Sequence, residues 1–165
     1  MILYHYTALL HLRTIAQDGM IRTTESNVGS GRVDWQPFGE HVGPDVVWLT
    51  TTQDPTKGQG LQGPADKTAA RIIVDVNDAA PWSRWCVAHG INPSWRGALE
   101  ARQLPDQWYV VERPVARGEW AGLEVAEESR VAPTKRTASG PRRQMRWVPF
   151  IAATTLTGPS SHKEE

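Results

Sequence analysis

The sequence contains few of the residues that build covalent cross-links and metal sites in small proteins. Its 165 residues include one cysteine, Cys86, and five histidines that are scattered along the chain. One cysteine can form neither an intramolecular disulfide nor a multi-cysteine metal site. The sequence therefore predicts no metal centre, and Cys86, within a tryptophan-rich helical stretch, is interpreted as a core residue rather than a nucleophile.

Net charge and long apolar runs are also missing. The 18 lysines and arginines are balanced by 18 aspartates and glutamates, so the whole chain has no electrostatic attraction for nucleic acid or acidic membranes. No stretch approaches the roughly 20 apolar residues of a membrane span, and the N-terminus has no signal-peptide pattern. We expect a cytoplasmic monomer that has no membrane partner.

The usual nucleotide and hydrolase motifs are absent too. There is no Walker loop, no G-x-G-x-x-G opening a helix and no G-x-S-x-G nucleophile elbow. Tryptophan, by contrast, is abundant, with eight residues against two phenylalanines. Such an excess is typical of a surface that stacks on planar rings, although a bias in composition gives the same count.

Strand-like segments outnumber helical ones along the chain. Strands are predicted over residues 2–6, 45–52, 69–76, 107–112, 121–128 and 144–150, and helices between Thr7 and Gly19 and over residues 82–91 and 94–104. Long loops are predicted over residues 23–45, 53–66 and 130–143. The pattern indicates a single α+β domain, residues 1–156, with a split or mixed sheet, few helices and long loops, and a disordered tail over residues 157–165.

Polar or aromatic groups interrupt three of these strands where a structural strand would be aliphatic. The segments are "LYHYT" (residues 3–7), "VVWLT" (46–50) and "QWYVVERPV" (107–115). Together they resemble the three-motif signature of the ADP-ribosyltransferase fold, in its diphtheria-toxin-like branch. That branch includes poly-ADP-ribose polymerases, DarT-type DNA ADP-ribosyltransferases and RNA 2′-phosphotransferases. The resemblance covers most of residues 2–115 and implies two short, mostly antiparallel sheets that form a cleft for NAD.

The first motif of this resemblance is "HYT". It implies that His5 hydrogen-bonds a ribose hydroxyl of NAD, while the backbone at Tyr6 and Thr7 holds the nicotinamide amide. A satisfied core histidine is the alternative interpretation of His5.

The second motif is "VVWLT". The resemblance implies that Trp48 stacks on the nicotinamide ring and that Thr50 supplies a small hydroxyl. It also gives Arg22, just after the first helix, a role at the pyrophosphate. Arg71, in a predicted central strand, is a second candidate phosphate ligand because a buried arginine needs an anion, which an aspartate of the chain could equally supply.

The third motif departs from the family, in which a glutamate near the start of a late strand supports the ribose and orients the acceptor. This sequence places Gln107 at that position, and Glu112 follows five residues later. Five residues of strand span about 16 Å and reverse the face, so the two side chains cannot substitute for one another without a bulge. Gln107 can hydrogen-bond a ribose hydroxyl but cannot act as a general base.

The resemblance implies an NAD-dependent ADP-ribosyltransferase with His5, Gln107 and Glu112 as candidate catalytic residues and NAD as co-substrate. The tryptophans and the basic segment 130–143 favour DNA, RNA or a nucleotide over a protein as acceptor. Two alternatives remain open. One is an RNA 2′-phosphotransferase, for which Arg71 and Arg113 would face the phosphate. The other is a non-catalytic module that binds NAD, ADP-ribose or a protein partner.

Overall fold

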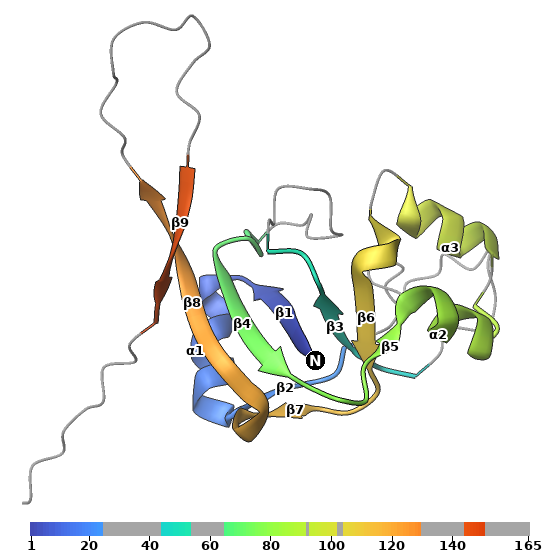
Figure 1. The fold of residues 1–165 in the computed structure, drawn as a ribbon, viewed down its shortest axis with the longest axis horizontal. Helices are drawn as coiled ribbons and strands as arrows, with labels where there is room; N and C mark the ends of the chain where they lie inside the picture. The colour runs from blue at the N-terminus through green and yellow to red at the C-terminus, as the bar shows by residue number, and fades with distance from the viewer. Residues whose placement is uncertain (25–43, 54–64, 92, 102–103, 130–143, 151–165) are drawn as a thin grey trace, which may run out of the picture.

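A seven-stranded antiparallel sheet forms the framework of the structure (Figure 1). Its strands lie in the order β5 (Ala80–Pro81), β6 (Trp108–Val111), β3 (Val47–Thr50), β1 (Ile2–Thr7), β4 (Ala70–Asp75), β8 (Trp120–Ser129) and β9 (Gln144–Pro149). A second, two-stranded sheet pairs β2 (Met20–Ile21) with β7 (Val115–Ala116). The predicted α+β class with antiparallel pairing is thereby confirmed.

The computed structural model describes residues 1–24, 44–53, 65–91, 93–101, 104–129 and 144–150. The predicted disordered tail, the basic segment 130–143 and most of the loops 23–45 and 53–66 lie outside these residues.

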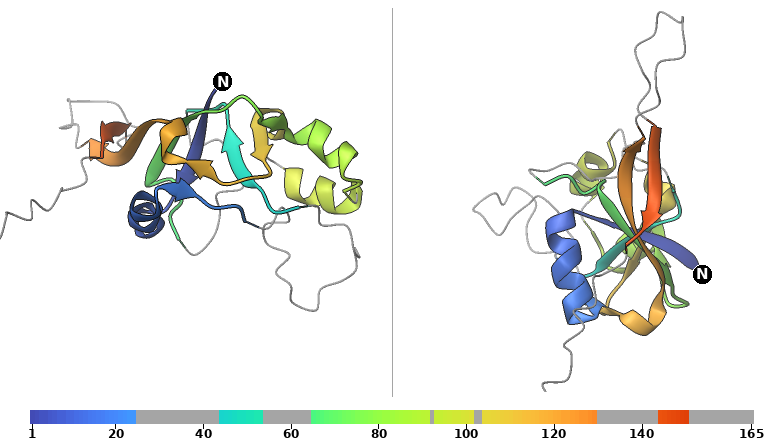
Figure 2. Two further views of the ribbon diagram at one scale, coloured as in Figure 1. Left: turned by 90° about the horizontal axis from the view of Figure 1, so that it is seen from below. Right: turned by 90° about the vertical axis from the view of Figure 1, so that its left-hand side faces the viewer.

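Three α-helices and two short 3-10 helices complete the described part of the chain. They are α1 (Leu9–Asp18), α2 (Trp82–Ala88), α3 (Pro93–Glu100), η1 (Pro105–Gln107) and η2 (Arg117–Glu119). Helix α1 flanks the strands on one side, α2 and α3 lie beyond β5 and β6, and the β8–β9 ribbon extends from the opposite end of the sheet (Figures 1 and 2). Among these described helices, none is long and apolar enough to span a membrane.

Apolar side chains pack on both faces of the sheet because successive strand residues point in opposite directions. On one face Leu3 and Ile72 pack with Leu12 of α1. On the other face Trp108 and Val110 of β6 belong to a cluster with tryptophans of α2. Each face therefore has its own core, and α1 and α2 cover different parts of the sheet.

The start of α1 differs from the sequence prediction, whereas its end agrees with it. Thr7, expected as the N-cap, is the last residue of β1 and lies opposite Ala70 of β4. Its backbone is therefore held in the strand ladder, and Ala8 precedes the helix without a side-chain cap. Gly19 ends the helix as predicted, with a left-handed φ of 68° that favours glycine.

The three motif strands are consecutive neighbours in the sheet. Strand β3 lies between β6 and β1, with Trp48 opposite Val110 and Thr50 opposite both Trp108 and Tyr4. Strands β1 and β3 are paired at one position, where Tyr4 lies opposite Thr50. By contrast, β1 pairs with β4 over six residues from Ile2 to Thr7. The sheet is therefore split between β1 and β3, past Tyr4.

Arg71 connects β4 to the outer part of the sheet. Its Nε donates to Glu124 Oε2 of β8 at 2.6 Å, and its Nη1 donates to the carbonyl of Gln53 at 3.2 Å. The guanidinium also lies 5.0 Å from the ring centroid of Tyr4 and 4.2 Å from that of Trp147. This buried arginine thus has an anion and two aromatic faces, which stabilise it away from water.

We predict that Arg71→Ala lowers the free energy of unfolding by about 3 kcal/mol, because it leaves the Glu124 carboxylate without its buried partner. The double variant Arg71→Met, Glu124→Met should recover much of that loss, since both charges are removed together. Urea denaturation measures both effects. Equal midpoints for wild type and Arg71→Ala would contradict the structural role of this pair.

Candidate functional site

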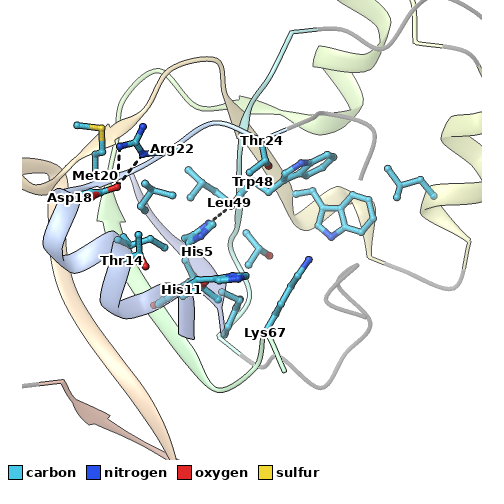
Figure 3. Close-up of a pocket in the computed structure, with 18 residues that line it drawn as sticks. His5, His11, Thr14, Asp18, Met20, Arg22, Thr24, Trp48, Leu49 and Lys67 are labelled. Carbon is cyan, nitrogen blue, oxygen red and sulfur yellow. Dashed lines mark hydrogen bonds and ion pairs between the residues drawn. The ribbon is translucent and has the colours of Figure 1, made fainter. Parts of the chain in front are cut away.

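A cavity of about 450 Å³ opens where β1 and β3 separate. This volume falls within the range of about 300–1,000 Å³ that is typical of small-molecule sites. The wall is formed by residues 4–7 of β1, residues 48–50 of β3, a polar stripe of α1 (His11, Thr14, Asp18), residues 20–22 and Thr24, together with Lys67, Leu99 and Trp108. The cavity therefore lies between α1 and the tryptophan cluster (Figure 3).

His5 is fixed in one tautomer at this split. Its Nδ1 lies 3.0 Å from the carbonyl oxygen of Trp48, and a carbonyl can only accept, so Nδ1 carries the proton (Figure 3). Burial lowers the pKa of the imidazole, and the nearby charge of Lys67 lowers it further, although the bond to Trp48 opposes both effects. A neutral His5 with a protonated Nδ1 leaves Nε2 as a hydrogen-bond acceptor.

Trp48 and Trp108 form the aromatic part of the cavity wall. The Trp48 ring lies 4.6 Å from the Trp82 ring and meets Trp108 edge-on, with centroids 5.9 Å apart and an angle of 89°. Both indole N–H groups are buried and have no hydrogen-bond partner among the described residues. The wall thus presents flat apolar ring surfaces, which suit a planar ligand, while the two unpaired N–H groups lie buried behind them.

The other predicted β1 and β3 residues also reach the cavity. Tyr6 and Thr7 line it next to His5, and Thr50 lines it next to Trp48. The Tyr6 hydroxyl donates to the carbonyl of Thr52 at 3.1 Å, and Thr50 Oγ1 accepts from the backbone N–H of Thr52 at 3.2 Å. The first bond ties β1 to the chain that follows β3, and the second fixes the chain as it leaves β3.

Arg22 lines the cavity and forms an ion pair with Asp18. Its Nε and Nη2 each lie 3.1 Å from Asp18 Oδ2, one turn back along the chain, and its side chain is 71% exposed. Such an exposed pair contributes little to stability and is easily rearranged, so the guanidinium remains accessible to an anion. Asp18 is the carboxylate among the described lining residues, and Arg22 neutralises it.

Neither candidate for the third motif lies in the cavity wall. Gln107 ends η1, where its carbonyl accepts from Thr51 N–H at 3.0 Å and its side-chain Oε1 is buried without a partner among the described residues. Glu112 follows β6 and accepts from Trp85 Nε1 at 2.7 Å, with His89 Nε2 also at 2.7 Å. Their catalytic roles stay predictions that the geometry of the cavity does not support.

The predicted arginine ligands other than Arg22 are also engaged elsewhere. Arg71 lies outside the cavity wall in its contact with Glu124. Arg113, the second arginine expected to face an RNA phosphate, donates to Asp78 and to Glu119 at 2.7 Å each. Those carboxylates already neutralise both guanidinium groups.

His11, Lys67 and Trp108 line the cavity and were not predicted. His11 shares one helix face with Thr14 and Asp18, a spacing of three and seven residues that marks a polar stripe in the sequence. Trp108 directly follows Gln107 in the third motif, and this position within the motif is a sequence signal that could have identified it. Lys67 lies in a turn before β4, where nothing in the local pattern indicates a site.

No group of three or more potential metal-ligating side chains occurs within the described ranges. Glu40 and His41, which are close to Asp45 in the sequence and are residue types that bind metals, lie outside these ranges. No known protein family, curated protein or solved structure matches this chain.

We predict that burial of neutral His5 makes the protein less stable in acid. Because the folded-state pKa is lowered from its usual 6.5, only the unfolded chain gains a proton as the pH falls below that value. The free energy of unfolding should then drop by up to about 1.4 kcal/mol per pH unit through this residue. Urea titrations of wild type and His5→Gln between pH 7 and pH 5 measure it, and identical pH dependences would contradict the burial of a neutral imidazole.

Proposed function

We propose that the protein binds NAD in this cavity and acts as an ADP-ribosyltransferase. The observation that carries the proposal is that residues from separate predicted motifs line one cavity: His5, Tyr6, Thr7, Arg22, Trp48 and Thr50. The resemblance requires these residues to meet around one ligand. Adjacent placement of β1, β3 and β6 supports it as well, because all three motifs come from neighbouring strands.

Each part of NAD has a chemically suitable partner in the cavity. A ribose hydroxyl donates to His5 Nε2, which is the free acceptor once Nδ1 is committed to Trp48. The nicotinamide ring packs against Trp48, and its amide is held by the backbone near Tyr6 and Thr7. Arg22 provides a cation for the pyrophosphate.

In the transfer reaction the bond between ribose C1″ and the nicotinamide nitrogen breaks, and nicotinamide leaves with the electron pair as a neutral molecule. A lone pair of the acceptor forms the new bond to C1″, and the acceptor releases its proton. Fixing the ribose through His5 and the leaving ring through Trp48 lowers the barrier by positioning. The neutral state of His5 adds no positive charge beside the developing oxocarbenium ion.

The described cavity wall has no unpaired carboxylate, and this affects which kind of acceptor the site can use. Asp18 is held by Arg22, and neither Gln107 nor Glu112 lines the cavity. A hydroxyl acceptor benefits strongly from a general base, whereas a ring nitrogen of a nucleobase already presents a lone pair. The site is therefore better suited to a nucleobase or nucleotide than to a hydroxyl of a protein side chain.

The same observation favours a second candidate, a module that binds NAD or ADP-ribose without catalysis. Such a module needs the ribose and ring contacts of His5 and Trp48 but no group that activates an acceptor. Release of nicotinamide distinguishes the two functions, because binding alone leaves NAD intact.

We predict that the purified protein binds NAD and releases nicotinamide when DNA, RNA or nucleotides are supplied as acceptors. Calorimetry measures binding, and chromatography of labelled NAD measures nicotinamide. His5→Ala should weaken NAD binding by about tenfold or more, because it removes the ribose acceptor. His89→Ala is the matched control, since His89 contacts Trp85 and Glu112 outside the cavity wall.

NAD binding without nicotinamide release, under all acceptor conditions, would establish the non-catalytic function. Failure of the wild-type protein to bind NAD would overturn the transferase, and failure to bind either NAD or ADP-ribose would overturn both. Melting temperatures of the two variants show whether a loss of binding reflects the site or the fold.

A further inference from the structure

Lys67 is placed against the cavity by the turn that precedes β4. Asp66 Oδ1 accepts from the backbone N–H of Thr68 at 2.9 Å and from its hydroxyl at 2.6 Å, which fixes the conformation around Lys67. Three residues later, Ala70 begins β4 opposite Thr7 at the end of the first motif strand. Figure 3 shows the lysine side chain extending from this turn into the cavity.

The ammonium group of Lys67 has no ion-pair partner among the described residues. The adjacent carboxylate of Asp66 accepts from Thr68 through Oδ1 and forms no ion pair with Lys67, and Asp18, in the cavity wall, is paired with Arg22. Lys67 nevertheless acts on His5, whose pKa its positive charge helps to lower. A partly buried cation beside an apolar wall is costly unless an anion accompanies it.

The positive charge of the described cavity wall is not balanced by a free carboxylate. Lys67 has no ion-pair partner among the described residues, and Asp18, the carboxylate of that wall, is paired with Arg22. The hydrogen bond to Trp48 makes His5 Nε2 a hydrogen-bond acceptor. The threonine hydroxyls of the wall can either donate or accept. A ligand that satisfies this wall carries several acceptor oxygens and negative charge, which are the properties of a phosphate or pyrophosphate group.

We propose that Lys67 is an anion-binding residue of the cavity in addition to Arg22, and that it seats a phosphate of a dinucleotide ligand beside the ribose held by His5. This inference rests on the proposed function for the identity of the dinucleotide. The binding of an anion by Lys67 is inferred independently of that function. Lys67 then separates phosphorylated ligands from neutral nucleosides, which share the planar ring and the ribose. Selectivity for charged nucleotides would come from the turn before β4 rather than from the motif strands.

The test compares the affinities of NAD, ADP-ribose, inorganic pyrophosphate and adenosine for four proteins by calorimetry at several salt concentrations. The proteins are wild type, Lys67→Gln, Lys67→Arg and Arg13→Gln. Lys67→Gln should weaken NAD and ADP-ribose by about tenfold or more and flatten the salt dependence. Lys67→Arg keeps the charge and should retain most of the affinity. Arg13→Gln removes an exposed charge of α1 outside the cavity wall and should change nothing.

The outcomes separate the two proposals. Unchanged affinity and salt dependence for NAD in Lys67→Gln would overturn the role of Lys67 while leaving NAD binding intact. If ADP-ribose or pyrophosphate binds in a Lys67-dependent way and NAD does not, the anion site stands and the proposed function falls. Binding of adenosine as tight as that of ADP-ribose would contradict recognition of phosphate.

Discussion

The cavity depends on the separation of β1 from β3 beyond the pair Tyr4–Thr50. At this point the imidazole of His5 supplies a hydrogen bond to the Trp48 carbonyl, so a buried backbone acceptor is satisfied although the two strands diverge. The same bond selects the tautomer of His5 and leaves its other nitrogen unused. One contact therefore lets the sheet open and determines what the opening can bind.

Four of the eight tryptophans, Trp48, Trp82, Trp85 and Trp108, form one cluster, which gives a structural role to half of them. Indole differs from phenylalanine in its N–H, and the inner members use it as a cross-link. Trp82 donates to Glu100 of α3 at 2.8 Å, and Trp85 donates to Glu112 after β6 at 2.7 Å. The cluster thus anchors α2 and α3 to the sheet. Its two outer members, Trp48 and Trp108, form the cavity wall and keep their N–H groups unused. A structural core and a stacking surface are therefore parts of one aromatic unit.

Sequence reasoning succeeded where a feature is local and failed where it depends on the rest of the fold. Strand β4 follows from its β-branched run, and the end of α1 follows from Gly19, because both are determined by nearby residues. The two-residue strands β5 and β7 exist through their pairing with β6 and β2, so no local pattern marks them. Lys67 was missed for the same reason, since its place in the site results from the register of β4 against β1. Arg71 was expected to need an anion, and the sheet supplies Glu124 directly opposite.

The charges around His5 constrain the chemistry as well as the binding. Lys67 is close enough to disfavour a second positive charge on the imidazole, and by the same reasoning it disfavours positive charge on a ribose held there. In the proposed transfer reaction, departure of nicotinamide would create such a charge at C1″. A phosphate seated on Lys67 would neutralise the ammonium and so remove its repulsion of the developing cation. The described cavity wall has no free carboxylate. The pyrophosphate of NAD would then provide the anion that this wall lacks.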